Sequence, residues 1–252
     1  MAYVEAQLKS LTGKACHGWQ MLADGDRVAV GLSGGKDSLS LLWLLHERRR
    51  RIPIDFELTA LHIDMGYGRV NQEELADFCR SLDVPFQVRH TDFGPRAHSE
   101  ENRKNSPCFY CAMNRRRELF QMCDEFGCNK LALAHHQDDI HETFFMNLLY
   151  AGSVSTMLPV VSFFGGRVIV IRPLSLASAA MTRRFAEHME LPVQPPCCPS
   201  AGHTKRAVVG EMLEGYYRDN KKVRANLWRA ITSTGLDQMP PPPSTMRKSR
   251  KK

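Results

Sequence analysis

The sequence predicts an α/β fold with a mostly parallel sheet and helices on both of its faces. Short apolar runs rich in β-branched residues alternate with segments of helical periodicity, which is the pattern of parallel strand–helix–strand units. The chain has 252 residues, enough for one such core with an elaboration. Hydrophobic residues make up 43% and charged residues 24%, so most of the chain is expected to fold.

The individual elements follow from periodicity and from their bounding residues. Strands are predicted over 27–32, 56–64, 85–90 and 130–135. Helices are predicted over 3–23, 39–50, 72–83, 108–126, 138–152 and 180–191, with one or two more within 205–232. Residues 160–174 predict a hairpin about Gly165 and Gly166. Residues 92–107 are polar and contain Gly94, Pro95 and Pro107, which predicts a mobile loop.

The domain organisation that we expect has four parts. An N-terminal helix over 1–24 precedes a main domain over 25–220, and a C-terminal helix over 221–236 precedes a disordered basic tail over 237–252. The tail has too little apolar content to fold. With no apolar run of eighteen residues and no signal-peptide pattern, we expect neither a membrane span nor secretion. Eight cysteines without a secretory signal favour a reducing compartment, the cytoplasm.

The charge balance is basic, with a formal net charge of +7. Such a balance favours a polyanionic partner such as RNA. Part of the excess lies in the tail, so a charged tail on a neutral domain is an equal alternative. Basic residues also cluster at 48–51 and 115–117, outside the tail.

The strongest local signal is the hexapeptide SGGKDS, which directly follows a predicted strand and precedes a helix. Glycines let the backbone approach phosphate oxygens, and the unpaired amides at a helix start favour an anion. The pattern is neither a Walker A loop nor a dinucleotide-binding fingerprint. A capped glycine turn is the simpler alternative. The candidate phosphate-binding residues are Ser33, Gly34, Gly35, Lys36, Asp37 and Ser38.

This hexapeptide resembles the pyrophosphate loop of the PP-loop ATPases, also called N-type ATP pyrophosphatases. The resemblance implies a Rossmann-like fold that binds ATP with Mg²⁺, cleaves it between the α and β phosphates and adenylates a carbonyl oxygen. It also implies that Lys36 and Asp37 take part in the reaction.

A second polar stretch follows the predicted strand 130–135 and opens a helix at the same sheet edge. Asp138 and Asp139 are candidates to hold Mg²⁺ or to orient the target base, with helix N-capping as an equal alternative. Asp64, at the end of the strand 56–64, is a candidate adenosine contact. His135 joins the candidate ATP contacts, although a polar residue that ends a strand is the simpler interpretation.

The cysteines divide into two groups. Cys108 and Cys111 form a C-x-x-C pair, and Cys197 and Cys198 lie in a proline-rich loop. Zinc, a redox dithiol and an iron–sulfur cluster all remain open for such a set. Because adjacent side chains diverge, three thiolates with one cysteine left over suit a [4Fe-4S] cluster with one open iron. The other four are expected to be buried small hydrophobes: Cys16, Cys79, Cys123 and Cys128.

Five segments together resemble the TtcA family of tRNA-cytidine 2-sulfurtransferases: SGGKDS, CFYCAMNRRREL, AHHQDDIHETFFMNLLYAG, VIRPL and CCPSAGHTKRAVVGEML. The resemblance implies ATP-dependent thiolation of tRNA at cytidine 32, with a sulfur donor such as a cysteine desulfurase. It also implies a [4Fe-4S] cluster on Cys108, Cys111 and one later cysteine. We favour Cys198 over Cys197 as that ligand, although the family's two-residue spacer between these cysteines is missing here.

Arg115, Arg116 and Arg117 follow the C-x-x-C pair and are candidate tRNA contacts, of which helical spacing lets only one or two face the same way. A homodimer is a further expectation. The alternative functions are 2-thiouridine synthesis in tRNA, another PP-loop reaction such as that of a lysidine synthetase, and a non-catalytic zinc and RNA-binding protein.

Overall fold

A computed structural model of the chain describes residues 2–68, 70–200, 202 and 204–233. The contacts divide the chain into two compact units, one ending at Gly210 and the other starting at Glu211. The basic tail predicted over 237–252 lies outside the described residues. The domain limits predicted at 24, 220 and 236 stay predictions.

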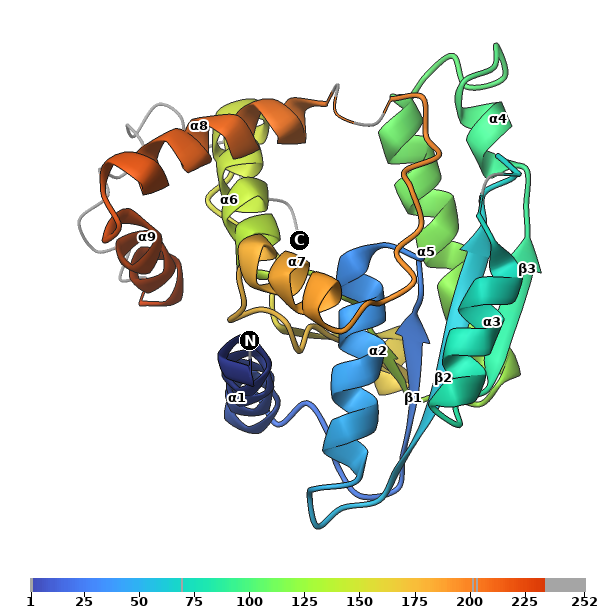
Figure 1. Ribbon diagram of the computed structural model, residues 1–252. Coiled ribbons are helices and arrows are strands. Elements are labelled where there is room, and N and C mark those ends of the chain that lie inside the picture. The colour runs from blue at the N-terminus through green and yellow to red at the C-terminus, as the bar shows by residue number, and fades with distance from the viewer. Residues whose placement is uncertain (1, 69, 201, 203, 234–252) are drawn as a thin grey trace. The chain divides into compact units, whose positions relative to one another are not determined.

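The first unit is built on a six-stranded sheet in the order β3-β2-β1-β4-β6-β5 (Figure 1). The strands are β1 (Asp26–Gly31), β2 (Phe56–Asp64), β3 (Phe86–His90), β4 (Lys130–Ala132), β5 (Val160–Phe163) and β6 (Val168–Ile171). Neighbouring strands are parallel except for the antiparallel pair β5 and β6. The mostly parallel sheet and the hairpin are therefore confirmed, and β4 is shorter than predicted.

The helices of the described residues are α1 (Ala2–Gly18), α2 (Lys36–Arg49), α3 (Gln72–Ser81), α4 (Phe93–Ala97), α5 (Pro107–Glu125), α6 (Gln137–Ala151), α7 (Ala179–His188), α8 (Lys205–Asp219) and α9 (Val223–Thr232). Side chains fix several starts: Ser106 accepts a hydrogen bond from the Phe109 amide of α5, and Ser178 accepts one from the Met181 amide of α7. Gly152 ends α6 with a φ of 60°.

Helix α4 differs from the sequence prediction, which placed a loop over 92–107. Phe93 and Ala97 are buried, and the Gly94 amide donates to the Met65 carbonyl at 2.8 Å. These contacts are tertiary, so a segment with little helical periodicity of its own forms one turn of helix against the end of β2.

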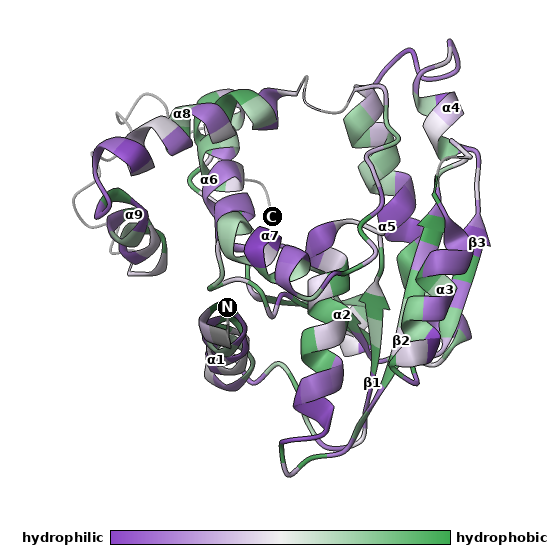
Figure 2. Ribbon diagram, in the orientation of Figure 1, coloured by the Kyte–Doolittle hydropathy of each residue, from purple (hydrophilic) through white to green (hydrophobic). Residues whose placement is uncertain are grey.

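The apolar side chains of each strand alternate between two cores. Val28 and Val30 of β1 pack with α1, α2, α3 and α7 on one face, whereas Ala29 packs with α5 on the other. Figure 2 shows the apolar residues concentrated on the strands and on the helix faces turned toward them. Helices on both faces of the sheet are thereby confirmed.

The strand order places a switch point between β1 and β4. The chain extends from β1 toward β2 and β3 on one side, and through β4 toward β6 on the other. In open α/β sheets, ligands bind outside the carboxyl ends of the strands at such a point. The hexapeptide follows β1 and the stretch His135–Asp139 follows β4, so both open onto this crevice.

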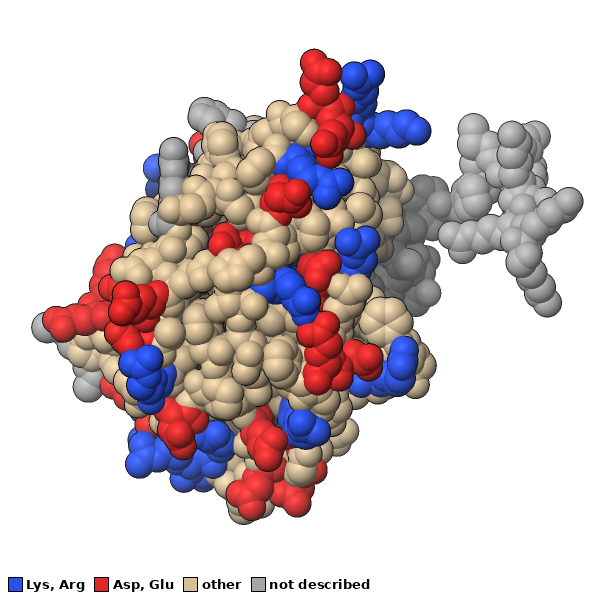
Figure 3. All heavy atoms as spheres, turned by 90° about the vertical axis from the view of Figure 1, so that its right-hand side faces the viewer, with Lys and Arg blue, Asp and Glu red and all other residues tan. Residues whose placement is uncertain are grey.

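Of the described residues, the second unit contains the end of α8 together with α9. Within it, the Arg224 guanidinium lies 4.1 Å from the centre of the Tyr217 ring, and its Nη2 is 3.5 Å from the Glu214 carboxylate. In the described parts of both units, none of the helices combines the length and apolar character needed to cross a bilayer. Figure 3 shows acidic and basic side chains interspersed over the described residues on the side of α3 and α4.

Candidate active site

The hexapeptide forms a self-bonded loop at the start of α2. The buried Ser38 hydroxyl accepts from the Ser33 amide at 3.1 Å and donates to the Gly35 carbonyl at 2.9 Å. Gly34 has a φ of +82°, which favours glycine because a side chain is strained there. The first amides of α2 have no carbonyl within the helix to bond. The loop therefore presents amides and the positive helix end to an anion.

Lys36 and Asp37 lie side by side at this helix start. The Lys36 Nζ is 2.6 Å from the Asp37 Oδ2, and the other Asp37 oxygen accepts a hydrogen bond from the Thr182 hydroxyl of α7. About a quarter of each side chain is exposed (26% and 27%), so both groups are accessible at the edge of the sheet.

A long loop passes directly over the phosphate loop. We call residues 192–200 the cysteine loop, because it carries Cys197 and Cys198. The Gln194 amide donates to the Gly34 carbonyl at 2.9 Å. A Cβ on Gly34 would lie 3.0 Å from the Gln194 Cγ, so the close approach depends on glycine.

The stretch after β4 is organised by a capping box. His136 is the N-cap of α6, with its ring Nδ1 accepting from the Asp139 amide while the Asp139 carboxylate accepts from the His136 amide. Asp138 is buried, and its Oδ2 accepts from the Ala179 amide at the start of α7 at 2.7 Å. Asp139 keeps 20% of its side-chain surface exposed, against 9% for Asp138.

Sequence reasoning missed two charged partners of this stretch, Arg206 and Glu142. The Arg206 Nη1 is 3.0 Å from the Asp139 Oδ1 and 3.4 Å from the Glu142 Oε2. Burial, together with the nearby Asp139 charge, raises the pKa of Glu142 to about 7. The three-residue spacing of Asp139 and Glu142 on one helix face was the available signal.

A third missed residue, Arg172, follows β6. It is buried, and its Nε donates to the His135 Nδ1 at 3.3 Å. Burial lowers the pKa of His135 to about 4, so the ring is neutral at physiological pH. Burial and the nearby Arg116 lower the pKa of Arg172 to about 10, a value at which it remains charged.

Asp64 is occupied by contacts within its own turn. Its carboxylate accepts from the Gly66 amide at 2.9 Å and from the Gln72 side chain at 2.8 Å, and lies 3.1 Å from the His90 ring. Burial raises the pKa of Asp64, but these hydrogen bonds outweigh burial and lower it overall. Asp64 therefore shapes the turn after β2, and its predicted contact with adenosine stays a prediction.

The three arginines of α5 diverge. Arg116 approaches Arg172 closely enough to lower its pKa, and Arg115 does the same to His135. Arg117 instead lies beside Glu118, with a distance of 3.6 Å, and lines a separate hollow with Phe120 and Phe164. Only the first two are thus turned toward the candidate site.

Cys111, Cys197 and Cys198 lie near Tyr67, and Cys108 lies near Cys111. The Tyr67 hydroxyl donates to the Cys198 sulfur at 3.8 Å, and Cys111 lies 3.8 Å from the Phe93 carbonyl. Burial raises the pKa of Cys111, and Cys198 and Cys108 raise it further, while Arg115 opposes them. In Figure 1 the cysteine loop, in orange after α7, runs beside α5 accordingly.

The donor set has the chemistry of an iron–sulfur site, because cysteine thiolates are the ligands of such clusters. All four cysteines are free, and Cys108 is exposed while the others are half-buried. Within the described residues, no three side chains of His, Cys, Asp or Glu converge closely enough to hold one metal ion. The remaining cysteines are buried in the cores, as predicted: Cys16, Cys79, Cys123 and Cys128.

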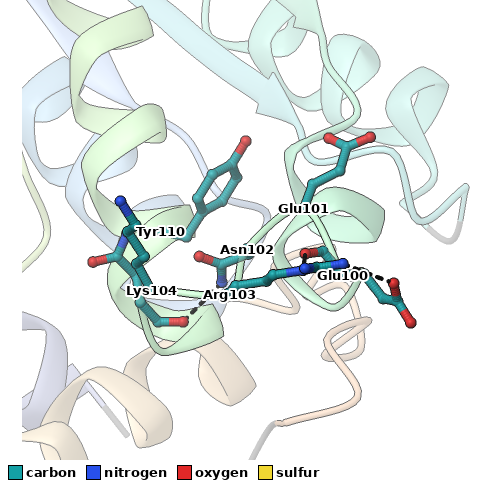
Figure 4. A pocket seen from close by; sticks show the side chains of 7 residues that line it. Glu100, Glu101, Asn102, Arg103, Lys104 and Tyr110 are labelled. Carbon is teal, nitrogen blue, oxygen red and sulfur yellow. Dashed lines mark hydrogen bonds and ion pairs between the residues drawn. The ribbon is translucent and has the colours of Figure 1, made fainter.

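A hollow of about 650 Å³ adjoins the cysteine end of α5. Figure 4 shows Tyr110 of α5 and Lys104 on one side of this hollow, and Glu100 and Glu101 on the other. The Asn102 side chain holds the loop before α5 by donating to the Ala97 and Asn105 carbonyls. Both signs of charge line the hollow, because Glu100 and Glu101 face it together with Arg103 and Lys104, and Arg103 lies 3.2 Å from the Glu100 carboxylate.

The fold and phosphate loop define a PP-loop protein, and the PP-loop domain family model matches residues 2–192. Curated relatives narrow the assignment. The tRNA-cytidine(32) 2-sulfurtransferase of Pelobacter propionicus is 38% identical, over 90% of this chain and 85% of its own. That of Alkalilimnicola ehrlichii is 36% identical, over 90% and 73%. The chain belongs to the tRNA-cytidine(32) 2-sulfurtransferase family.

Solved structures share the fold of this chain. The U34-tRNA thiolase NcsA from Methanococcus maripaludis, determined with its [4Fe-4S] cluster, superposes with a TM-score of 0.73 at 25% identity. The match covers 91% of this chain and 79% of the thiolase. An NH3-dependent NAD synthetase from Campylobacter jejuni shares the fold, with a TM-score of 0.50 at 14% identity.

Proposed function

We propose that this protein is an ATP-dependent tRNA sulfurtransferase that converts cytidine 32 to 2-thiocytidine. The observation that carries the proposal is that the cysteine loop, beside Cys111, is also bonded to the phosphate loop at Gly34. The proposal is supported by the family relatives, which are named for this activity and match 90% of this chain.

The reaction needs two displacements. The cytosine O2 attacks the α-phosphate of ATP, which releases pyrophosphate, and a sulfur nucleophile then attacks C2 and expels AMP with the original oxygen. Lys36 and the first amides of α2 neutralise the departing pyrophosphate. Asp37 and Asp139, the more exposed carboxylates, fit Mg²⁺, which proteins hold through one or two carboxylates together with substrate phosphates.

Arginines at the carboxyl edge of the sheet supply further positive charge. Arg206 holds the Asp139 carboxylate in place, and Arg172 donates a hydrogen bond to the neutral His135 ring, which follows β4. Arg115 and Arg116 extend this charge along α5 toward the tRNA, whose backbone phosphates they are suited to bind. Asp138, which bonds the start of α7, is assigned to the support of this arrangement.

A [4Fe-4S] cluster on Cys108, Cys111 and Cys198 would supply an iron free of protein thiolate at which sulfur is held. We assign the third position to Cys198 because the cysteine loop's electrostatic effect on Cys111 comes from this residue. The sulfur itself would come from a donor such as a cysteine desulfurase. We further place the protein in the cytoplasm and expect a homodimer.

A second candidate function is 2-thiouridine synthesis, favoured by the likeness to the U34-tRNA thiolase. Both functions use the same adenylation chemistry on a base O2, so they differ only in the nucleoside produced. A lysidine synthetase-like reaction needs no cluster, and the gathered cysteines would then have no role.

The decisive experiment is thiolation of tRNA by the reconstituted protein with ATP, Mg²⁺ and sulfide under anaerobic conditions. Digested tRNA analysed by mass spectrometry should contain 2-thiocytidine, lost when Cys108 is replaced by serine. Appearance of 2-thiouridine would establish the second candidate. Full activity of colourless, iron-free protein would overturn the cluster assignment.

A further inference from the structure

We propose that Tyr67 is a positioning residue for the third cluster thiolate, holding the Cys198 sulfur so that Cys198, and not its neighbour Cys197, completes the ligand set. This inference rests on the proposed function, since it concerns the same cluster. It adds a residue from the turn after β2, a segment that contains no cysteine.

Two polar groups converge on the Cys198 sulfur. The Tyr67 hydroxyl donates to it at 3.8 Å, and the His98 Nε2 lies 3.9 Å from it. The two rings also touch, with centroids 6.5 Å apart. The hydrogen bonds found among the described residues include none to the Cys197 sulfur. Adjacent cysteines are thereby distinguished by side chains that come from two other segments of the chain.

The backbone around Tyr67 is built to hold its ring. A Cβ on Gly94 would lie 2.5 Å from two carbons of this ring, so the phenol rests directly on the glycine backbone of α4. The Gly94 amide in turn donates to the Met65 carbonyl at 2.8 Å. On the other side, the Gly66 amide donates to the Asp64 carboxylate at 2.9 Å, and Gly66 has a φ of +81°. The position of the Tyr67 ring is therefore restrained by the Gly94 backbone against which it packs and by the turn at Gly66 that precedes it.

A hydroxyl that donates to a cluster thiolate has two physical effects. It restrains the sulfur in one orientation, and outer partners of this kind typically change metal retention by about 10- to 100-fold. It also stabilises the more negative, reduced cluster, so hydrogen bonds to the sulfurs raise the reduction potential. A residue that merely packs would not have the second effect.

The test compares Tyr67→Phe with wild type after anaerobic reconstitution, with Tyr3→Phe on the exposed surface of α1 as the matched control. Tyr67→Phe should lower the reduction potential of the cluster and speed its loss to a chelator by about 10-fold. Gly94→Ala should have the same effects, because its Cβ displaces the Tyr67 ring although the tyrosine itself is retained. Unchanged potential and retention in Tyr67→Phe, with circular dichroism showing a folded protein, would overturn the inference.

A measurement on metal-free protein separates this inference from the proposed function. Iodoacetamide labelling, resolved by fragment mass spectrometry, should modify Cys197 faster than Cys198 in wild type. Tyr67→Phe should accelerate labelling of Cys198 alone. If wild type takes up no cluster but shows this pattern, the proposed function fails while the contact stands. If the cluster forms and Tyr67→Phe matches wild type in both measurements, only the role of Tyr67 is refuted.

Discussion

The phosphate loop and the cysteine site are assembled in opposite ways. The loop is six consecutive residues that bond one another, with Ser33, Gly35 and Ser38 joined by hydrogen bonds of 2.9 to 3.3 Å. The cysteine site is drawn from three segments, and its contact between Tyr67 and Cys198 spans 131 residues. The first is thus specified locally, whereas the second exists only once the whole first unit has folded.

Because they are assembled differently, we expect the two sites to be separable in function, although they share an edge of the sheet. The phosphate loop holds charge with backbone amides and Lys36, and the cysteine site offers sulfur and one phenol hydroxyl. Substitutions that break one site should therefore leave the other intact.

Lys36→Ala should impair the phosphate loop and leave the cysteine site intact. Removing the ammonium leaves the departing pyrophosphate without its side-chain counter-charge, so release of AMP and pyrophosphate should fall by about 100-fold or more. Iron content and visible absorbance should match wild type. Lys14→Ala, on the exposed surface of α1, is the control and should retain full activity. Loss of iron in Lys36→Ala would show that the sites are not separable.

Substitutions of the two adjacent cysteines test the cysteine site, with Cys197→Ser as the matched control for Cys198→Ser. Cys198→Ser should reduce iron content and thiolation by at least about 10-fold, the scale of a lost metal-site partner, while ATP binding persists. Cys197→Ser should stay close to wild type in iron content. Iron analysis and 2-thiocytidine yield measure both. The reverse ranking would reassign the third ligand to Cys197.

Two neighbouring arginines sharpen the comparison, because α5 passes from the cysteines toward the nucleotide edge. Arg116 approaches Arg172, whereas Arg117 points to a hollow with Phe120. Arg116→Ala should weaken tRNA binding and reduce the slope of log affinity against log salt by about 1, as for one lost phosphate contact. Arg117→Ala should change the slope much less. Equal slopes for both variants would contradict the assignment of Arg116.

The smallest expected effect is a pH dependence at Glu142. Its pKa is raised to about 7, so the folded state binds a proton that the unfolded state releases near pH 4.5. Stability from this group is therefore complete below pH 4.5 and is lost as pH rises through 7. Glu142→Gln should gain on the order of 1 kcal/mol relative to wild type between pH 5 and pH 8. Denaturation midpoints are measured for both proteins at each pH. A difference between Glu142→Gln and wild type that stays constant from pH 5 to pH 8 would refute the raised pKa.

What the sequence could predict follows the same division between local and tertiary structure. The sheet, the hairpin and the phosphate loop were predicted, because periodicity and glycine placement encode them locally. Helix α4 was missed because its stability comes from contact with Met65, far from any local pattern. Arg172 and Arg206 were missed as site residues for a similar reason: an arginine after a strand or in the first turn of a helix gives no signal until its carboxylate or imidazole partner is placed beside it.

The choice between Cys197 and Cys198 shows the limit most clearly. Neither spacing nor residue type separates two adjacent thiols, so the preference for Cys198 over Cys197 rests on the family resemblance alone. Tyr67 and His98 separate them in space, and nothing in the sequence around either residue indicates a contact with a cysteine.

The hydrogen bond from Gln194 to Gly34 ties the cysteine loop to the phosphate loop only four residues before Cys198. Suppose that bound nucleotide and a bound cluster both favour the same conformation of Gln194. Thermodynamic linkage then requires that each ligand strengthens the binding of the other by the same factor. Through this one backbone hydrogen bond, the two sites would then change each other's binding affinity by the same factor.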